Sequence, residues 1–152
     1  MPAVQWSDKY ALGVEQMDVT HREFIEMLNA VFDAPDDQVL PALDRFIEHT
    51  EAHFEQENRW MAETGFPPVH CHTTEHNNVL GVMREVRGMV ADGKAEIGRV
   101  LAREMAPWFD VHAASMDAAL AAWLNGKSFS PEVQSLCGGS ACSPAQTTAE
   151  TA

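Results

Sequence analysis

The feature of this sequence that most constrains its fold is a helical repeat of apolar residues that recurs in four separate stretches. Within each stretch, apolar side chains return every three or four positions, and this spacing places them on one face of an α-helix. Short segments that contain Gly, Pro and Asp, residues typical of turns and loops, separate the stretches. The expected helices cover residues 18–33, 38–64, 69–91 and 95–124. Four long amphipathic helices with short connections predict an all-α fold, an antiparallel up-down-up-down four-helix bundle.

The two ends of the chain lack this repeat. Residues 1–17 hold scattered apolar anchors, which predict an ordered N-terminal arm. Residues 127–152 are dominated by Ser, Ala, Thr, Gly and Pro, and they predict a flexible, mostly disordered C-terminal tail. We therefore expect one bundle domain over residues 1–126 and a tail over residues 127–152 that carries two of the three cysteines.

Charge and composition narrow the range of partners. The chain has 152 residues and a net charge of −13, from 23 acidic and 10 basic side chains. Because such a surface repels phosphate groups, we expect no nucleic-acid partner. No apolar run approaches the ~20 residues of a membrane span, and the N-terminus has neither the basic nor the apolar region of a secretion signal. We therefore expect a cytoplasmic monomer without a membrane span.

The spacing of the histidines carries most of the functional information. Five of the seven histidines fall on the apolar, inward faces of the four expected helices. The second helix pairs a histidine with a glutamate four residues later, and the third helix pairs two histidines at the same spacing. Residues four apart share one helix face, so each pair can hold one ion. The set comprises His21, His53, Glu57, His72, His76 and His112.

These inward-facing polar residues favour a metal site over an ordinary core. A single histidine on an apolar face is usually a core residue with a satisfied hydrogen bond. Five buried imidazoles without partners, however, would each cost roughly 1–3 kcal/mol. Five nitrogens and two or more carboxylates exceed one tetrahedral zinc site, so they suit two ions bridged by carboxylates. Imidazole with carboxylate suits iron, while zinc, copper and nickel stay open by ligand type.

The motifs around these residues resemble those of the hemerythrin family, in its single-domain bacterial form. The resemblance covers about residues 6–124. The motifs are Trp6…Tyr10-x-Leu-Gly-Val…Asp18-x-x-His21, His53-Phe-Glu-Gln-Glu57…Met61, Gly65-Phe-Pro…His72-x-x-x-His76 and Trp108-x-x-x-His112-x-x-x-x-Asp117. All seven ligand positions of the family are filled, in order and at the family's spacing. The family often has a second acid directly after the ligand glutamate, where this chain has Asn58.

The resemblance implies a ligand set and a cofactor of two non-haem iron ions with an oxo or hydroxo bridge. By position, one iron would be held by His72, His76 and His112. The other iron would be held by His21 and His53, and this iron would keep one vacant coordination position. Glu57 and Asp117 would bridge the two ions. Asp117 comes from the resemblance alone: it lies five residues after His112, about 140° further round an α-helix, so periodicity classes it as a surface acid.

The resemblance also implies a function, namely reversible O2 binding for oxygen storage, delivery or scavenging. O2 is then the expected ligand, and an oxygen-using partner protein is left open. The alternative is a diiron enzyme or sensor that acts on peroxide, nitric oxide or iron. Ferritin-like diiron oxidases use more carboxylates and Glu-x-x-His pairs on two helices. Five histidines to two acids therefore favour oxygen carriage, and we expect a binding protein and not an enzyme.

A few chemically interesting residues remain outside this set. His49 lies four residues before His53, and it is either a hydrogen-bond partner behind the site or a partly exposed histidine. His70 and Cys71 adjoin a ligand, but adjacent helical residues point in different directions, so both are expected to be non-ligands. In the tail, a glycine-containing segment joins Cys137 to Cys142 and would allow a disulfide, a pair of thiolates or two idle thiols. Pro107 is expected to kink the fourth helix near Ala106.

Overall fold

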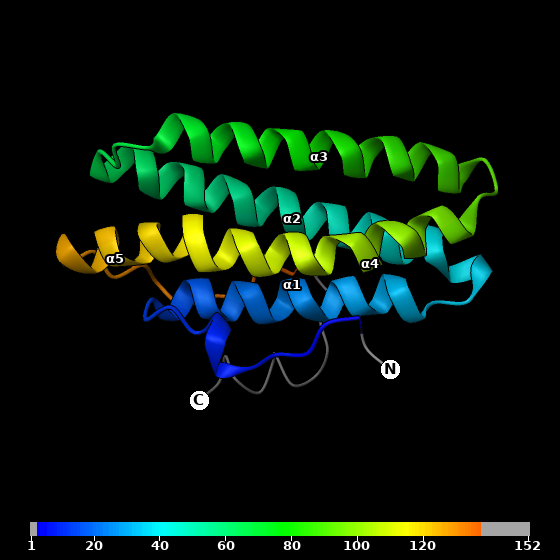
Figure 1. Ribbon diagram of the computed structural model, residues 1–152, viewed down its shortest axis with the longest axis horizontal. Helices are drawn as coiled ribbons and strands as arrows, with labels where there is room; N and C mark the ends of the chain where they lie inside the picture. Colours follow the sequence, from blue (N-terminus) through cyan, green and yellow to red (C-terminus); the bar gives the residue numbers. More distant parts are fainter. Residues whose placement is uncertain (1–2, 138–152) are drawn as a thin grey trace.

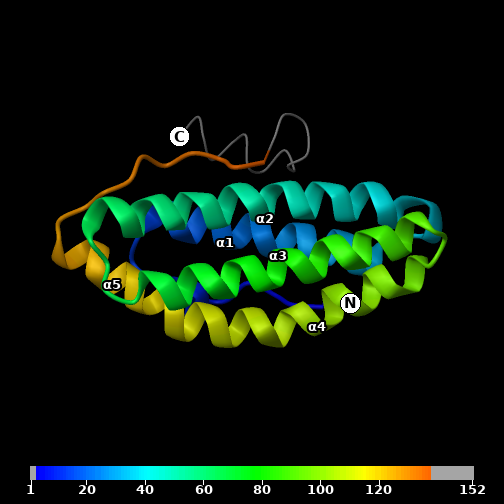
Figure 2. The same cartoon turned by 90° about the horizontal axis from the view of Figure 1, so that it is seen from above.

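The computed structural model describes residues 3–137, and over them the chain is helical without a β-strand. The long helices lie side by side in Figure 1, and the view from above in Figure 2 agrees. α1 packs against α2 and α4, and α3 packs against the same two helices. The helices are η1 (Asp8–Tyr10), α1 (Glu15–Asp33), α2 (Asp36–Thr64), α3 (Val69–Ala91), α4 (Ala95–His112), η2 (Ala113–Asp117) and α5 (Ala118–Gly126). The predicted four-helix bundle is therefore confirmed.

The ends of the helices follow local chemistry. α2 begins with Asp36 and Asp37, two acids that favour the positive end of the helix dipole. It stops at Gly65, whose φ of 70° lies in the left-handed region that glycine adopts without strain. α3 has the bounds that the periodicity predicts, whereas α1 begins three residues earlier than predicted and α2 two residues earlier.

The fourth predicted helix is divided in the structure. α4 continues through Pro107 to His112, and the departure from α-helical geometry comes only afterwards, in the π-helical turn η2. The chain then returns to an α-helix in α5. A π-helical turn closes its hydrogen bonds one residue later than an α-helix does, so it contains one extra residue. This extra residue changes which side chains share the inner face.

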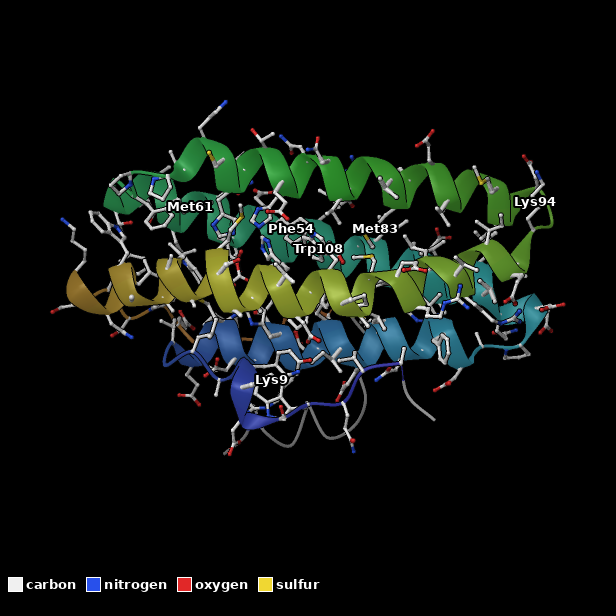
Figure 3. All side chains as sticks on the ribbon, in the orientation of Figure 1. Lys9, Phe54, Met61, Met83, Lys94 and Trp108 are labelled. Carbon is white, nitrogen blue, oxygen red and sulfur yellow. The ribbon has the colours of Figure 1, made fainter. Side chains whose placement is uncertain are left out.

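The bundle interior consists of two apolar regions with buried polar side chains between them. The larger region centres on the fully buried rings of Phe24, Phe46 and Phe109, with Phe24 stacked on Phe109 at a centroid distance of 4.7 Å. The smaller region includes Met61 and Phe66. Buried histidine rings contact both apolar regions: the His21 ring lies against Phe109, and the His72 ring lies against Phe66. In Figure 3, Phe54 lies between Met61 and Met83 along the bundle.

Segments at both ends of the described chain pack on the bundle. In the N-terminal arm, the buried Tyr10 ring stacks on Phe109 at 5.4 Å, and its hydroxyl donates a hydrogen bond to Asp110. After α5, residues 128–137 run back along the bundle on the side of α1 and α2, and we call this segment the C-terminal strap (Figure 2). The backbone of Gln134 exchanges two hydrogen bonds with the Gln16 side chain, of 2.6 and 2.8 Å. The division of the chain at residue 126 stays a prediction, and Cys142 lies outside the described residues.

The described part of the chain also bears on membrane insertion. Between residues 3 and 137, no helix combines the length and apolar character needed to cross a bilayer.

Candidate metal centre

The fold brings all seven sequence-predicted ligand residues into one buried cluster. α1 contributes one of them, α2 two, α3 two, α4 one and the π-helical turn η2 one. None of these residues is more than 2% exposed to solvent. They are His21, His53, Glu57, His72, His76, His112 and Asp117. Burial of this many ionisable groups in one place requires partners that can compensate the loss of water.

The cluster divides into two groups that share their carboxylates. Within each group, the nitrogen and oxygen atoms that could bind an ion all lie within 4.8 Å of one another. One group combines three histidines with Glu57 and Asp117, and the other combines two histidines with the same two carboxylates. The three-histidine group contains His72, His76 and His112, and the two-histidine group contains His21 and His53.

Glu57 faces both groups with different oxygen atoms. Its Oε2 lies 3.0 Å from His53 Nε2 and 3.7 Å from His21 Nε2. Its Oε1 lies 3.5 Å from His72 Nε2 and 3.3 Å from His76 Nε2. One oxygen therefore points to each histidine group, which is the arrangement of a carboxylate that bridges two ions.

Asp117 is placed in the same way. Its Oδ1 lies 3.1 Å from His72 Nε2 and 3.1 Å from His112 Nε2. Its Oδ2 lies 3.1 Å from His21 Nε2, in the other group. Two carboxylates thus span the same pair of histidine groups from α2 and from the π-helical turn.

Several inward-pointing atoms of the cluster have no hydrogen-bond partner. Their number and direction test whether the cluster is suited to metal ions. Within residues 3–137, the site-facing buried atoms without a hydrogen-bond partner include His21 Nε2, Glu57 Oε1, His76 Nε2, His112 Nε2 and Asp117 Oδ2. Leaving a buried polar atom unsatisfied costs about 1–3 kcal/mol. Lone pairs that converge without hydrogen bonds are satisfied by a bound cation, so the residues present fit a pair of metal ions.

The electrostatics of the metal-free cluster favour anionic carboxylates. Burial acts to raise the pKa of Glu57, but His53, His21 and His72 hold it well below its usual range. The pKa of Asp117 is also lowered, because the histidines around it outweigh burial and the repulsion from Glu57. Both carboxylates are therefore ionised at neutral pH and present negative charge to a cation.

The histidines respond to the carboxylates in opposite ways. Burial alone would lower the pKa of His21, but the adjacent carboxylates of Asp117 and Glu57 raise it to about 10. The same two carboxylates overcome burial at His72 and raise its pKa to about 9. At His53, burial dominates and lowers the pKa to about 4. Without metal, the cluster therefore holds protons on some histidines, and an incoming metal ion must displace them.

Outer contacts orient two of the histidines. Asn58 Oδ1 lies 3.0 Å from His76 Nδ1, so the residue that follows Glu57 supplies an uncharged acceptor to this ring. His112 Nδ1 lies 3.6 Å from Glu75 Oε2, and the Trp108 ring, whose Nε1 donates to Glu75, stacks on the His112 ring at 4.6 Å. Such contacts fix the ring orientation of a metal-binding histidine.

The remaining histidines are placed outside the cluster. His49 is 1% exposed, and its Nε2 lies 3.0 Å from Glu23 Oε1. It is therefore buried, and it packs beside a cluster histidine, with 6.0 Å between the His49 and His53 ring centroids. His70 and Cys71 are both exposed on α3, away from the cluster, in agreement with their expected status as non-ligands.

Comparisons with known proteins agree with this geometry. The family model described as the hemerythrin HHE cation binding domain matches residues 12–124. A bacteriohemerythrin of Ralstonia nicotianae is 48% identical over 124 residues, which cover 82% of this chain and 90% of that protein. A bacteriohemerythrin of Stenotrophomonas maltophilia is 28% identical over 125 residues, with coverage of 80% and 81%.

The fold has a counterpart among solved structures. The crystal structure of a single-residue mutant of hemerythrin superposes with a TM-score of 0.72 at 22% sequence identity. The match covers 82% of this chain and 98% of that one. At this identity the likeness concerns the fold.

Proposed function

The chain belongs to the hemerythrin family, and we propose that it binds O2 reversibly at a non-haem diiron centre. The observation that carries the proposal is the pair of buried carboxylates, Glu57 and Asp117, each of which offers one oxygen to each of two histidine groups. A bound iron pair supplies the two electrons that reversible O2 binding requires. The donor set of imidazoles and carboxylates suits iron.

The unequal histidine groups support a division of roles between the two metal positions. We assign one ion to His72, His76 and His112, and the other to His21 and His53. With both carboxylates shared, the second position has one protein ligand fewer than the first. The place for O2 is therefore assigned to the side of His21 and His53.

Aromatic rings wall the side of the cluster where O2 is expected. The Phe109 ring meets the His21 ring edge-on at 5.2 Å, and the Phe24 ring meets the His53 ring at 5.8 Å. Both phenylalanines are at most 1% exposed. A buried, apolar wall limits access of water and external proton donors to the site. This environment supports release of O2 unchanged over its conversion to products.

An apolar cavity adjoins the cluster on another side. Its volume is about 250 Å³, and Phe66, Met116 and Ala119 are among its lining residues. The ring of His72 reaches its wall. The cavity lies between the start of α3 and the π-helical turn, and it brings an apolar surface suited to a small apolar molecule next to the metal centre.

Enzymatic or sensory use of the same centre is the competing proposal. Family members are generally O2 carriers, and carboxylate-rich oxidases of the ferritin type place Glu-x-x-His pairs on two helices. This site instead combines five histidines with two carboxylates. The histidine-rich donor set favours carriage over turnover of peroxide, nitric oxide or iron.

One spectroscopic cycle tests the proposal. The chain is reconstituted with iron(II) under anaerobic conditions, and its visible spectrum is followed in O2 and again after O2 removal. We expect an absorption band that appears with O2 and disappears when O2 is removed, over repeated cycles. A centre that oxidises once and then stays ferric would contradict carriage and favour the enzyme or sensor.

A further inference from the structure

A second cluster of metal-binding side chains lies outside the centre described above. It combines Glu23 of α1, His49 of α2 and Cys137 of the C-terminal strap. One ligand atom from each residue lies within 4.8 Å of the other two. Three separate elements therefore bring a carboxylate, an imidazole and a sulfur together.

Two members of this cluster are fully buried, and not all of their nitrogen and oxygen atoms take part in hydrogen bonds. Glu23 is 0% exposed and His49 is 1% exposed. His49 Nε2 lies 3.0 Å from Glu23 Oε1, which also accepts a hydrogen bond of 3.1 Å from the Leu136 amide. His49 Nδ1 is buried and has no hydrogen-bond partner within residues 3–137. An unsatisfied buried imidazole nitrogen is costly, so its retention needs an explanation.

We propose that Glu23, His49 and Cys137 form a second metal site, which binds one divalent ion of the zinc class when Cys137 is a thiol. A thiolate, an imidazole and a carboxylate are the ligands that zinc takes in proteins, with a fourth place for water or another side chain. Ligand atoms in a tetrahedral zinc site are about 3–4 Å apart. The 4.8 Å limit of this cluster is close enough to reach that spacing through small side-chain movements.

The oxidation state of Cys137 controls the site. In the structure Cys137 is disulfide-bonded, and a disulfide sulfur is a poor metal ligand. A cellular dithiol can reduce this bond: the dithiol gives up two electrons and two protons, becomes a disulfide itself, and leaves two thiols on the protein side. When the ion binds, the Cys137 thiol loses its proton to solvent and the sulfur–metal bond forms.

Metal at this position would join three elements. The strap already contacts α1 through the two hydrogen bonds between Gln134 and Gln16. A bound ion would add a link from the strap to α2. The link would lie beside the diiron centre, because the rings of His49 and His53 are 6.0 Å apart.

The test uses the full chain with its iron already bound, so that added zinc does not fill the diiron centre. The chain is reduced with a phosphine, which opens disulfides without adding thiols, and zinc chloride is titrated in by calorimetry. Bound zinc and iron are then counted after desalting. We expect one zinc per reduced chain beyond the iron, and no zinc in the oxidised chain.

Three variants make the test specific. Cys137→Ser should abolish the extra zinc, whereas Cys71→Ser, which removes an exposed cysteine on α3, should leave it unchanged. His49→Gln should weaken zinc binding while the iron content stays that of the parent chain. Cobalt(II) in place of zinc should give a sulfur-to-metal absorption band that Cys137→Ser lacks. The proposal is overturned if the reduced chain binds no extra zinc, or if Cys137→Ser binds it as well as the parent.

Discussion

His112 Nε2 lies 3.1 Å from Asp117 Oδ1, although the two residues are five positions apart along the chain. In an α-helix, a five-residue separation turns side chains about 140° apart. The π-helical turn over Ala113–Asp117 contains one extra residue, and this returns Asp117 to the face of His112. The irregular turn therefore delivers the second carboxylate to the centre, and such turns are frequent at functional sites.

The bridging role of Asp117 predicts the effect of removing its charge. Asp117→Asn keeps the size of the side chain but gives up the negative charge shared by the two histidine groups. We expect the variant to fold and to retain about half or less of the iron bound by the parent, since loss of contacts that tune a metal site already costs about 10–100-fold in affinity. Iron is counted after desalting. Full iron content in Asp117→Asn would contradict the bridging assignment.

The ligand role of His72 predicts a loss of both metal and stability. In His72→Ala, iron content and the midpoint of thermal unfolding should fall together, because metal binding and folding are coupled. His70→Ala offers the matched control, since His70 is exposed two residues earlier on the same helix. We expect that control to behave as the parent in both measurements. A His72→Ala chain that retains two irons and binds O2 normally would show that His72 is not a ligand.

The metal-free chain should lose stability as the solution becomes alkaline. Asp117 and Glu57 outweigh burial and raise the pKa of His21 to about 10 and of His72 to about 9 in the folded state, from 6.5. Their protonated forms therefore stabilise the folded state fully below about pH 6.5, and this contribution is lost as the pH rises through about 9 and 10.

Urea unfolding of the iron-free chain, at several pH values with a chelator present, measures this effect. The free energy of unfolding should fall steadily between about pH 6.5 and about pH 10. The iron-loaded chain should show a much smaller loss over this range, because iron replaces the protons on the histidines. A metal-free chain whose stability is constant or rises over this range would refute the predicted charge states.

From the contacts of the C-terminal strap, we expect two shortened chains to differ in their free energy of unfolding. Ending the chain after residue 126 removes the hydrogen bonds from the strap to Gln16 and Glu23 and uncovers the buried carboxylate. The free energy of unfolding should then fall by about 1–3 kcal/mol. In a reducing buffer, where the disulfide of Cys137 is open in the parent as well, ending the chain after residue 137 keeps these contacts and should change stability by less than about 0.5 kcal/mol. Equal stabilities in urea would mean that the strap contributes nothing. O2 binding should persist in both truncated chains.

Periodicity predicted the bundle because buried helices must repeat their apolar residues every three or four positions. The same repeat placed the five cluster histidines and Glu57 on inner faces, where the structure has them. Asp117 could not be found in this way, because the calculation of its direction assumed an α-helix and the chain forms a π-helical turn there. Only the resemblance to a known family indicated this residue from the sequence.

The environment of His49 also exceeded what the sequence could predict. Its position four residues before His53 left open whether it was buried or partly exposed. Its burial depends on Glu23 of α1 and on the strap, a segment without periodicity whose packing follows from hydrogen bonds to Gln16 and Glu23. The contacts of the strap join residues more than 100 positions apart, and no local pattern in the sequence reports them.

The positions of bound iron decide whether this chain holds a pair of ions bridged by carboxylates. Crystals of the iron-loaded chain, measured at the iron absorption edge, would show each bound iron as a peak of anomalous scattering. We expect two peaks, one beside His72, His76 and His112 and the other beside His21 and His53, with Glu57 and Asp117 between them. A single peak, or iron bound away from these two carboxylates, would contradict this expectation.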